Sequence, residues 1–136
     1  MKNLSVIILS FIIFGIVSCK KSGNTNPGIA GNWRILKDST YSSGIGCCGS
    51  PASTVFTGTA ADYFEFTIGG TLYIKEAAQR DTASYSVNSA NQLILSHDGF
   101  THSFDIITRT TSNLTLKNDF ITPGGRLIRF VYLQKT

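Results

Sequence analysis

The sequence lacks the features that would place it in several common functional classes. Its basic residues form no run beyond Lys20-Lys21, which argues against a nucleic-acid-binding face. It has no Cys-x-x-Cys pair for redox catalysis and no Gly-rich phosphate loop between a strand and a helix. No serine is placed with a histidine and an acid in a recognisable triad. We therefore expect no enzymatic activity, no cofactor and no nucleic-acid partner.

Long hydrophobic runs are also scarce. The one continuous apolar stretch, residues 4–17, is shorter than the roughly 20 residues that a membrane-spanning helix needs, and no similar stretch follows it. Lys2 precedes this stretch and Ser18-Cys19 ends it, which is the arrangement of an N-terminal signal peptide. We predict that residues 1–18 are removed and that the mature chain does not cross the membrane.

The end of this segment, Ile16-Val17-Ser18-Cys19, resembles the lipobox of bacterial lipoproteins. In that family the peptide before the cysteine is cleaved, and the cysteine becomes the first residue, with acyl chains such as palmitate on its sulfur and its amine. The resemblance implies that Cys19 is lipidated. The alternative is an ordinary secretory signal that ends in a cysteine by chance, but such a cleavage site requires only small residues and no thiol.

Residues 19–28 are expected to form the lipid anchor and a flexible tether. The stretch after Cys19 is polar, rich in small residues and interrupted by Gly and Pro. Lys20-Lys21 suits contact with membrane head groups. No acidic run of the kind that resembles a surface-export signal is present. We therefore expect a protein anchored in the outer membrane and facing the periplasm.

Residues 29–136 have the length of one domain and the pattern of an all-β fold. No segment shows helical periodicity, and short alternating strands are separated by turn residues. The expected strands are residues 29–37, 54–57, 63–67, 72–76, 82–87, 92–97, 100–108, 114–117 and 126–135. Residues 54–67 form either one strand or two. About eight strands joined by short hairpins predict an antiparallel up-and-down β-barrel.

The turn after Phe66 can be predicted from the register of its strands. A two-residue turn, Gly69-Gly70, would move the apolar side chains that follow to the wrong face of the sheet. A three-residue turn, Ile68-Gly69-Gly70, instead pairs Phe66 with Leu72. We therefore expect the three-residue turn, with Gly70 in the left-handed conformation.

Gly31-Asn32-Trp33 at the start of the first strand resembles the Gly-x-Trp signature of lipocalin-like barrels. With the short motifs that follow, the whole mature chain resembles the small lipocalin-like lipoproteins common in Bacteroidota. Those motifs are residues 64–67, 69–72, 85–87, 91–95, 113–116 and 131–135. The resemblance implies that the first inter-strand loop covers the open end of the barrel. It also implies that an arginine of the last strand, Arg126 or Arg129, packs over Trp33.

The barrel interior is the candidate binding site. An eight-stranded barrel has room either for packed side chains or for one small ligand, and the sequence leaves both open. The ligand would be small and largely apolar, and the protein a monomer. The alternative is a solidly packed barrel whose loop meets a partner protein. The residues expected to contact a ligand are Trp33, Phe64, Phe66, Tyr85, Leu95, His97, Phe100, His102 and Phe104.

Two histidines are the sharpest candidates within this set. Asp98-Gly99 is a strong signal for a type I′ turn, which pairs His97 with Phe100 and His102 with Leu95. Both imidazoles then lie on the apolar face at one rim of the barrel. They could anchor the polar head of a ligand or simply reach solvent. No third ligand has the spacing of a metal site, so we expect no bound metal.

The loop expected over residues 39–53 contains the adjacent Cys47 and Cys48. Exposed thiols seldom stay free in an oxidising compartment, which favours a disulfide between these neighbours. Bonds to another chain and two buried thiols are the alternatives. If residues 54–67 form one strand, the alternation of strand directions places this loop at the same end of the barrel as Asp98-Gly99.

Overall fold

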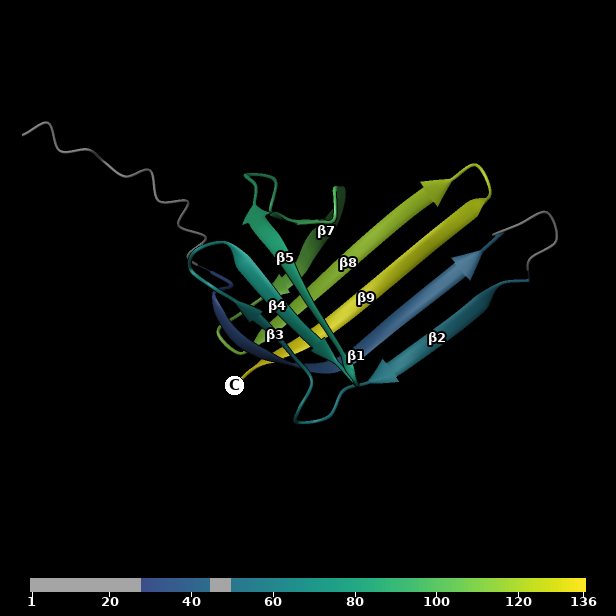
Figure 1. Cartoon of the computed structure of the whole chain (residues 1–136). Coiled ribbons are helices and arrows are strands. Elements are labelled where there is room, and N and C mark those ends of the chain that lie inside the picture. Colours follow the sequence, from purple (N-terminus) through teal and green to yellow (C-terminus); the bar gives the residue numbers. More distant parts are fainter. Residues whose placement is uncertain (1–27, 45–49) are drawn as a thin grey trace, which may run out of the picture.

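A computed structural model describes residues 28–44 and 50–136, and all regular structure in these residues is antiparallel β-strand (Figure 1). The nine strands of this part are β1 (Gly31–Ser43), β2 (Ala52–Thr57), β3 (Tyr63–Phe66), β4 (Thr71–Glu76), β5 (Gln79–Val87), β6 (Gln92–His97), β7 (Phe100–Arg109), β8 (Asn113–Thr122) and β9 (Gly125–Lys135). Cys19, Cys47 and Cys48 lie outside the described residues, so their lipidation and disulfide stay predictions.

The sheet closes into a barrel because β1 pairs with β9 along most of its length. Each later strand pairs with its neighbour in the sequence from β3 to β9. The second edge of β1 is shared, since β3 pairs with its first residues and β2 with its second half. With β2 and β3 counted as one position, the ring is the predicted eight-stranded up-and-down barrel, an architecture that lipocalins share.

Strands β2 and β3 are two pieces of one interrupted strand, and both run antiparallel to β1 on the same edge. The chain leaves the sheet between them, over residues 58–62. A Cβ atom at Gly58 would come within 2.1 Å of the Ile35 carbonyl oxygen, so only glycine fits there. The buried carboxylate of Asp62 holds this excursion by accepting hydrogen bonds from the backbone N–H groups of Thr59, at 2.7 Å, and Ala77, at 2.8 Å.

The alternating strand directions give the barrel two different ends. The base is the end where β1 begins and β9 finishes, and the Thr136 N–H donates to the Asn32 carbonyl there, at 3.1 Å. The mouth is the opposite end, with the β1–β2, β4–β5, β6–β7 and β8–β9 connections. The connection after β1 and the Asp98-Gly99 turn therefore share an end, as predicted for residues 54–67 acting as one strand position.

The loop expected over residues 39–53 is shorter than predicted. Residues as far as Ser43 belong to β1 and pair with β9, and β2 begins at Ala52. The Ser and Thr residues at positions 39–43 are typical of loops, but their side chains are also compatible with a β-strand whose two faces are partly exposed. As a result, the β1–β2 and β8–β9 hairpins extend side by side beyond the rest of the barrel (Figure 1).

The predicted three-residue turn between β3 and β4 is confirmed. Phe66 pairs with Leu72, and Gly70 has a φ of 85°. This register keeps both side chains inside the barrel, where each is no more than 1% exposed. The hydrophobic alternation of the two strands therefore set the length of the turn.

A β-bulge in β1 changes which of its residues face inward. The register against β9 shifts between Ile35 and Lys37. Before the shift Trp33 and Ile35 are buried, and after it Asp38 is buried while Lys37 is exposed. Unbroken alternation would have turned Lys37 into the barrel. The bulge thus exchanges a lysine for a carboxylate in the interior.

The base half of the barrel is filled by a continuous apolar core. Its buried residues are Ile29, Trp33, Ile35, Phe64, Phe66, Leu72, Tyr85, Leu93, Leu95, Phe104, Ile106, Leu114, Leu116, Val131 and Leu133. All nine strands except β2 contribute to it. The largest of these side chains that is fully buried is Trp33, whose indole N–H donates to the Ile29 carbonyl at 2.7 Å.

The expectation that Arg126 or Arg129 covers Trp33 is wrong. The Lys135 ammonium lies 4.5 Å from the centroid of the Trp33 ring, because Lys135 is the register partner of Trp33. Arg126 instead pairs with Asp119 on the outer surface. Arg129 faces inward but lies in the mouth half of the barrel. The cation–π contact at this tryptophan is therefore kept, with a different cation.

Candidate functional site

The mouth half of the barrel contains a cavity of about 350 Å³. It is lined by Ile74, Asp81, Ala83, Leu95, His97, Phe100, His102, Phe104, Asn118, Leu127 and Arg129. A second hollow of about 400 Å³ adjoins it and is lined by Asp38, Thr40, Thr54, Val55, Phe56, Glu76, Leu127 and Arg129. The two share Leu127 and Arg129. The linings mix apolar side chains such as Leu95, Phe104 and Leu127 with small and polar ones such as Ala83, Asn118 and Thr40.

Five of the predicted ligand contacts come together at this cavity: Leu95, His97, Phe100, His102 and Phe104. The other four, Trp33, Phe64, Phe66 and Tyr85, lie in the packed base and line neither hollow. They are at most 6% exposed because they fill the interior themselves. The structure therefore brings only the mouth-side part of the predicted set to the open space.

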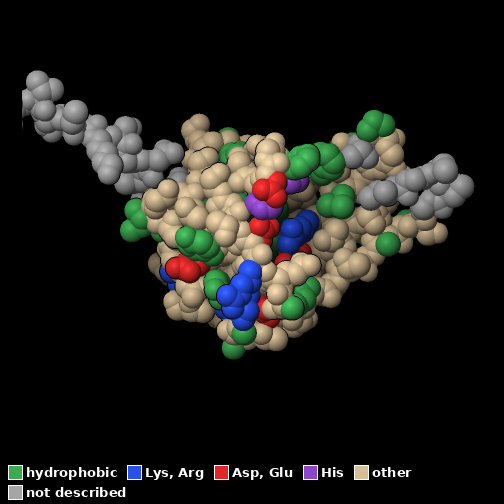
Figure 2. All heavy atoms as spheres, viewed as in Figure 1, with side chains coloured by type: hydrophobic (Ala, Val, Ile, Leu, Met, Phe, Trp, Pro, Cys, Tyr) green, Lys and Arg blue, Asp and Glu red, His purple; other side chains and the backbone are tan. Residues whose placement is uncertain are grey.

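The two histidines lie on the inner face of β6 and β7, as the register predicts. Asp98 and Gly99 have φ values of 48° and 80°, as a type I′ turn requires, and His97 pairs with Phe100. His97 Nε2 lies 2.9 Å from Oδ1 of Asp81 on β5. Figure 2 shows histidine, acidic and basic side chains gathered in the middle of the face in view.

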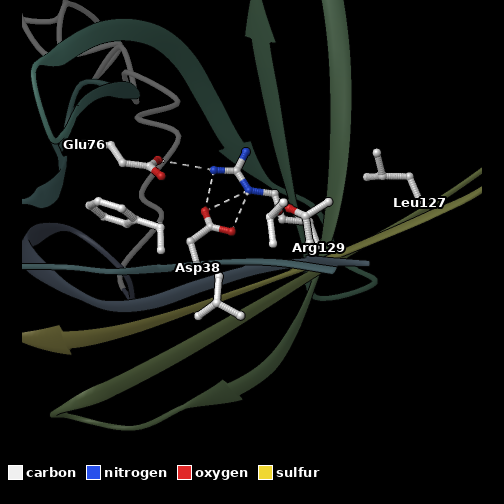
Figure 3. Close-up of a pocket in the computed structure, with 8 residues that line it drawn as sticks. Asp38, Glu76, Leu127 and Arg129 are labelled. Carbon is white, nitrogen blue, oxygen red and sulfur yellow. Dashed lines mark hydrogen bonds and ion pairs between the residues drawn. The ribbon is translucent and has the colours of Figure 1, made fainter. Parts of the chain in front are cut away.

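Arg129 occupies the boundary between the two hollows. Its Nε donates to Oδ2 of Asp38 at 2.9 Å, its Nη2 donates to the same carboxylate, and Nη2 lies 3.5 Å from Oε2 of Glu76 (Figure 3). The three side chains come from β9, β1 and β4. Asp38 is 5% exposed, whereas Arg129 and Glu76 remain open to the hollows.

The sequence reasoning missed the ion-pair group of Asp38, Arg129 and Glu76. The sequence pattern indicates Arg129 only as a possible cover for Trp33, and it does not single out the two acids. Strand alternation alone could have put Arg129 and Glu76 on inner faces, since each follows inward residues at even spacing. Asp38 could not be found in this way because the bulge reverses its orientation.

Burial and nearby charges both shift the pKa values of Glu76 and Arg129. Burial raises the pKa of Glu76, the carboxylates of Asp38 and Asp62 raise it further, and Arg129 opposes them. Burial also disfavours the charge of Arg129, but its hydrogen bonds to Asp38 and the attraction of both acids hold its pKa above the ordinary value. Asp38 is therefore matched by Arg129, and Glu76 is the less well compensated carboxylate.

The described residues contain neither a cluster of metal-binding side chains nor a membrane-spanning helix. No group of three or more His, Cys, Asp or Glu side chains in residues 28–44 and 50–136 could hold a metal ion. The same part of the chain has no helix with the length and apolar character needed to cross a membrane.

Comparison with known proteins adds one structural likeness. No protein-family model matches the sequence, and no curated protein matches it. Among solved structures, a deswapped triple mutant of bovine odorant binding protein is similar, with 14% sequence identity and a TM-score of 0.46. The match covers 79% of this chain and 73% of the bovine chain.

Proposed function

We propose that this chain is a membrane-anchored binding protein, rather than an enzyme, that holds one small and largely apolar ligand in the mouth half of its barrel. The observation that carries this proposal is the cavity of about 350 Å³ above a packed core. Apolar walls with a few convergent polar groups are typical of small-molecule sites. Here Leu95, Phe104 and Leu127 form the apolar walls, and His97 and His102 are the polar groups at the rim.

The alternative function is that of a solidly packed interaction protein. The base half of the barrel fits that alternative, because its buried apolar side chains form one continuous core. The mouth half favours the binding proposal, because two hollows adjoin there and share the lining residues Leu127 and Arg129. We therefore prefer ligand binding as the function.

The proposed anchor would give the barrel an orientation. Residue 28 lies at the base, where β1 begins, and Cys19 precedes it by only nine residues. A lipid on Cys19 would hold the base towards the outer membrane and leave the mouth directed into the periplasm. A ligand would then exchange with the aqueous space.

Filling the cavity is expected to weaken binding. We predict that the neutral probe 2-(1-naphthyl)ethanol binds the purified full chain, and that Leu127→Trp weakens this binding at least about tenfold, because the indole occupies the space that both hollows share. Naphthalene fluorescence and calorimetry measure the affinity. Ile121→Trp, at an outer position that is 72% exposed, is the matched control and should bind as the parent does. Equal affinity of Leu127→Trp and the parent would contradict the proposal.

Replacing Cys19 by alanine is expected to remove the anchor. The variant should no longer partition with membranes, because a thiol is needed to carry the acyl chain. Detergent phase separation of labelled cells measures this directly, with Cys48→Ala as a control that keeps the proposed lipidation site. An alanine variant that still partitions with membranes would show that the anchor lies elsewhere.

A further inference from the structure

We propose that the cavity selects ligands whose polar head is positively charged, such as a protonated amine on an apolar body. This inference rests on the proposed binding function and specifies its ligand class. It follows from the charged groups that line the two hollows and from how they are already paired.

Carboxylates outnumber guanidinium and ammonium groups inside the mouth. The two hollows are lined by three carboxylates, Asp38, Glu76 and Asp81, against one guanidinium, Arg129, and no lysine; the other basic side chains of the lining are the imidazoles of His97 and His102. Arg129 meets both carboxylate oxygens of Asp38, so these two charges neutralise one another. Glu76 and Asp81 are the surplus carboxylates, because Glu76 lies 3.5 Å from Arg129 and Asp81 meets an imidazole rather than a guanidinium or ammonium group. A cationic head group would supply the missing positive charge in a partly desolvated place.

The surplus carboxylates also have the capacity to accept more hydrogen bonds. Glu76 contacts Arg129 through Oε2 at 3.5 Å, which is beyond normal hydrogen-bond length. Asp81 contacts His97 through Oδ1 and is about half exposed, which leaves its second oxygen accessible. An ammonium group has three donors and no acceptor, and this complements such a pair of sites.

An anionic head group would meet the opposite conditions. Arg129 is the one guanidinium or ammonium group that lines the hollows, and its Nε and Nη2 already donate hydrogen bonds to Asp38. A ligand carboxylate at Arg129 would lie close to Asp38 and Glu76 and would be repelled by both. Two nearby strand cations, Arg126 and Lys117, face outward, where both pair with Asp119 on the outer side of β8.

Apolar surface stands beside these charges and can take the body of the ligand. Leu95 and Phe104 form the wall next to the core, and Leu127 separates the two hollows. Phe100 is 70% exposed at the rim, and a bound aromatic group would cover it. The arrangement therefore fits an amphiphilic amine that enters with its apolar end against the core-side wall.

Three probes of similar shape test this inference on the purified full chain. They are 2-(1-naphthyl)ethylamine as its cation, 2-(1-naphthyl)ethanol and 1-naphthylacetate as its anion. At pH 8 we expect the cation to bind at least about tenfold more tightly than the alcohol, and the anion at least about tenfold more weakly, because each tenfold step needs only a small part of the interaction of two nearby charges. Fluorescence titration and calorimetry give the three affinities.

Variants identify the groups responsible. Glu76→Gln should lower the affinity for the cation much more than the affinity for the alcohol, so that most of the preference for the cation is lost, and Asp81→Asn should reduce the preference by a smaller factor, since Asp81 is more exposed. Asp119→Asn removes a carboxylate from the outer face and should leave all three affinities unchanged. Circular dichroism and a urea titration establish that each variant is folded.

The outcomes separate this inference from the binding proposal beneath it. If the parent binds the alcohol but the cation binds no more tightly, the ligand class is wrong and the binding function stands. If the anion binds as tightly as the cation, the ligand class is also wrong. If none of the three probes binds, the binding function fails and this inference fails with it. A cation preference that survives in both Glu76→Gln and Asp81→Asn would overturn the assignment of these carboxylates.

Discussion

Replacing Trp33 by alanine should lower the free energy of unfolding by about 3–5 kcal/mol, which is the typical loss for a large aromatic side chain in a well-packed core. Trp33 is 1% exposed and sits at the centre of the packed base. The change also removes the hydrogen bond from its indole to the Ile29 carbonyl and the contact with Lys135. Because a domain is typically stable by only about 5–15 kcal/mol, the variant should unfold at much lower urea concentration.

The conservative variant Trp33→Phe provides the control for this loss. Phenylalanine keeps much of the apolar volume but cannot donate to Ile29, so the loss should be about half as large. Urea unfolding followed by far-ultraviolet circular dichroism measures both variants. If Trp33→Ala lost less than about 1 kcal/mol, the base would not be the part of the barrel on which stability depends.

Replacing Arg129 by methionine should lower the free energy of unfolding by about 2–4 kcal/mol. The change leaves the Asp38 carboxylate, which is 5% exposed, without its main hydrogen-bonding partner. We expect less than the 3–5 kcal/mol found for fully buried pairs, because the Arg129 side chain is 36% exposed and water in the cavity can solvate the site.

A double-mutant cycle distinguishes the loss of the ion pair from the loss of packing. Asp38→Leu combined with Arg129→Met removes both charges, and the double variant should be at least as stable as either single variant. Chemical denaturation of the four proteins gives the coupling energy. Additive single losses, with no coupling, would show that Arg129 and Asp38 contribute independently of one another.

The parts of the fold that could be predicted depend on residues near one another in the sequence. The Asp98-Gly99 turn and the three-residue turn after Phe66 each follow from local alternation and from where glycine stands. The predicted strand lengths are less accurate, because β1 and β8 both extend further towards the mouth than expected. Polar residues begin the outer part of each strand, Asp38 to Thr40 in β1 and Lys117 to Asp119 in β8, so the hydrophobic pattern does not show where the strands stop.

The candidate site could be predicted only in part for the same physical reason. His97 and His102 belong to one hairpin, so the local register was enough to put them at the rim of the barrel. Asp38 and Arg129 are far apart in the sequence and meet through the β1–β9 pairing. The bulge that turns Asp38 inward depends on that pairing, and so does the division of the barrel into a packed half and an open half.

The interruption between β2 and β3 makes the wall of the mouth a separable part of the molecule. In the described residues β2 pairs with β1 alone, whereas β3 carries the continuity of the ring. Insertions or substitutions in β2 need no compensating change in the register of β4 to β9. Thr54 and Phe56 line the hollow from this strand, so the shape and polarity of the hollow can be changed by design, or by natural variation, through one short hairpin, while the packed base keeps the barrel stable.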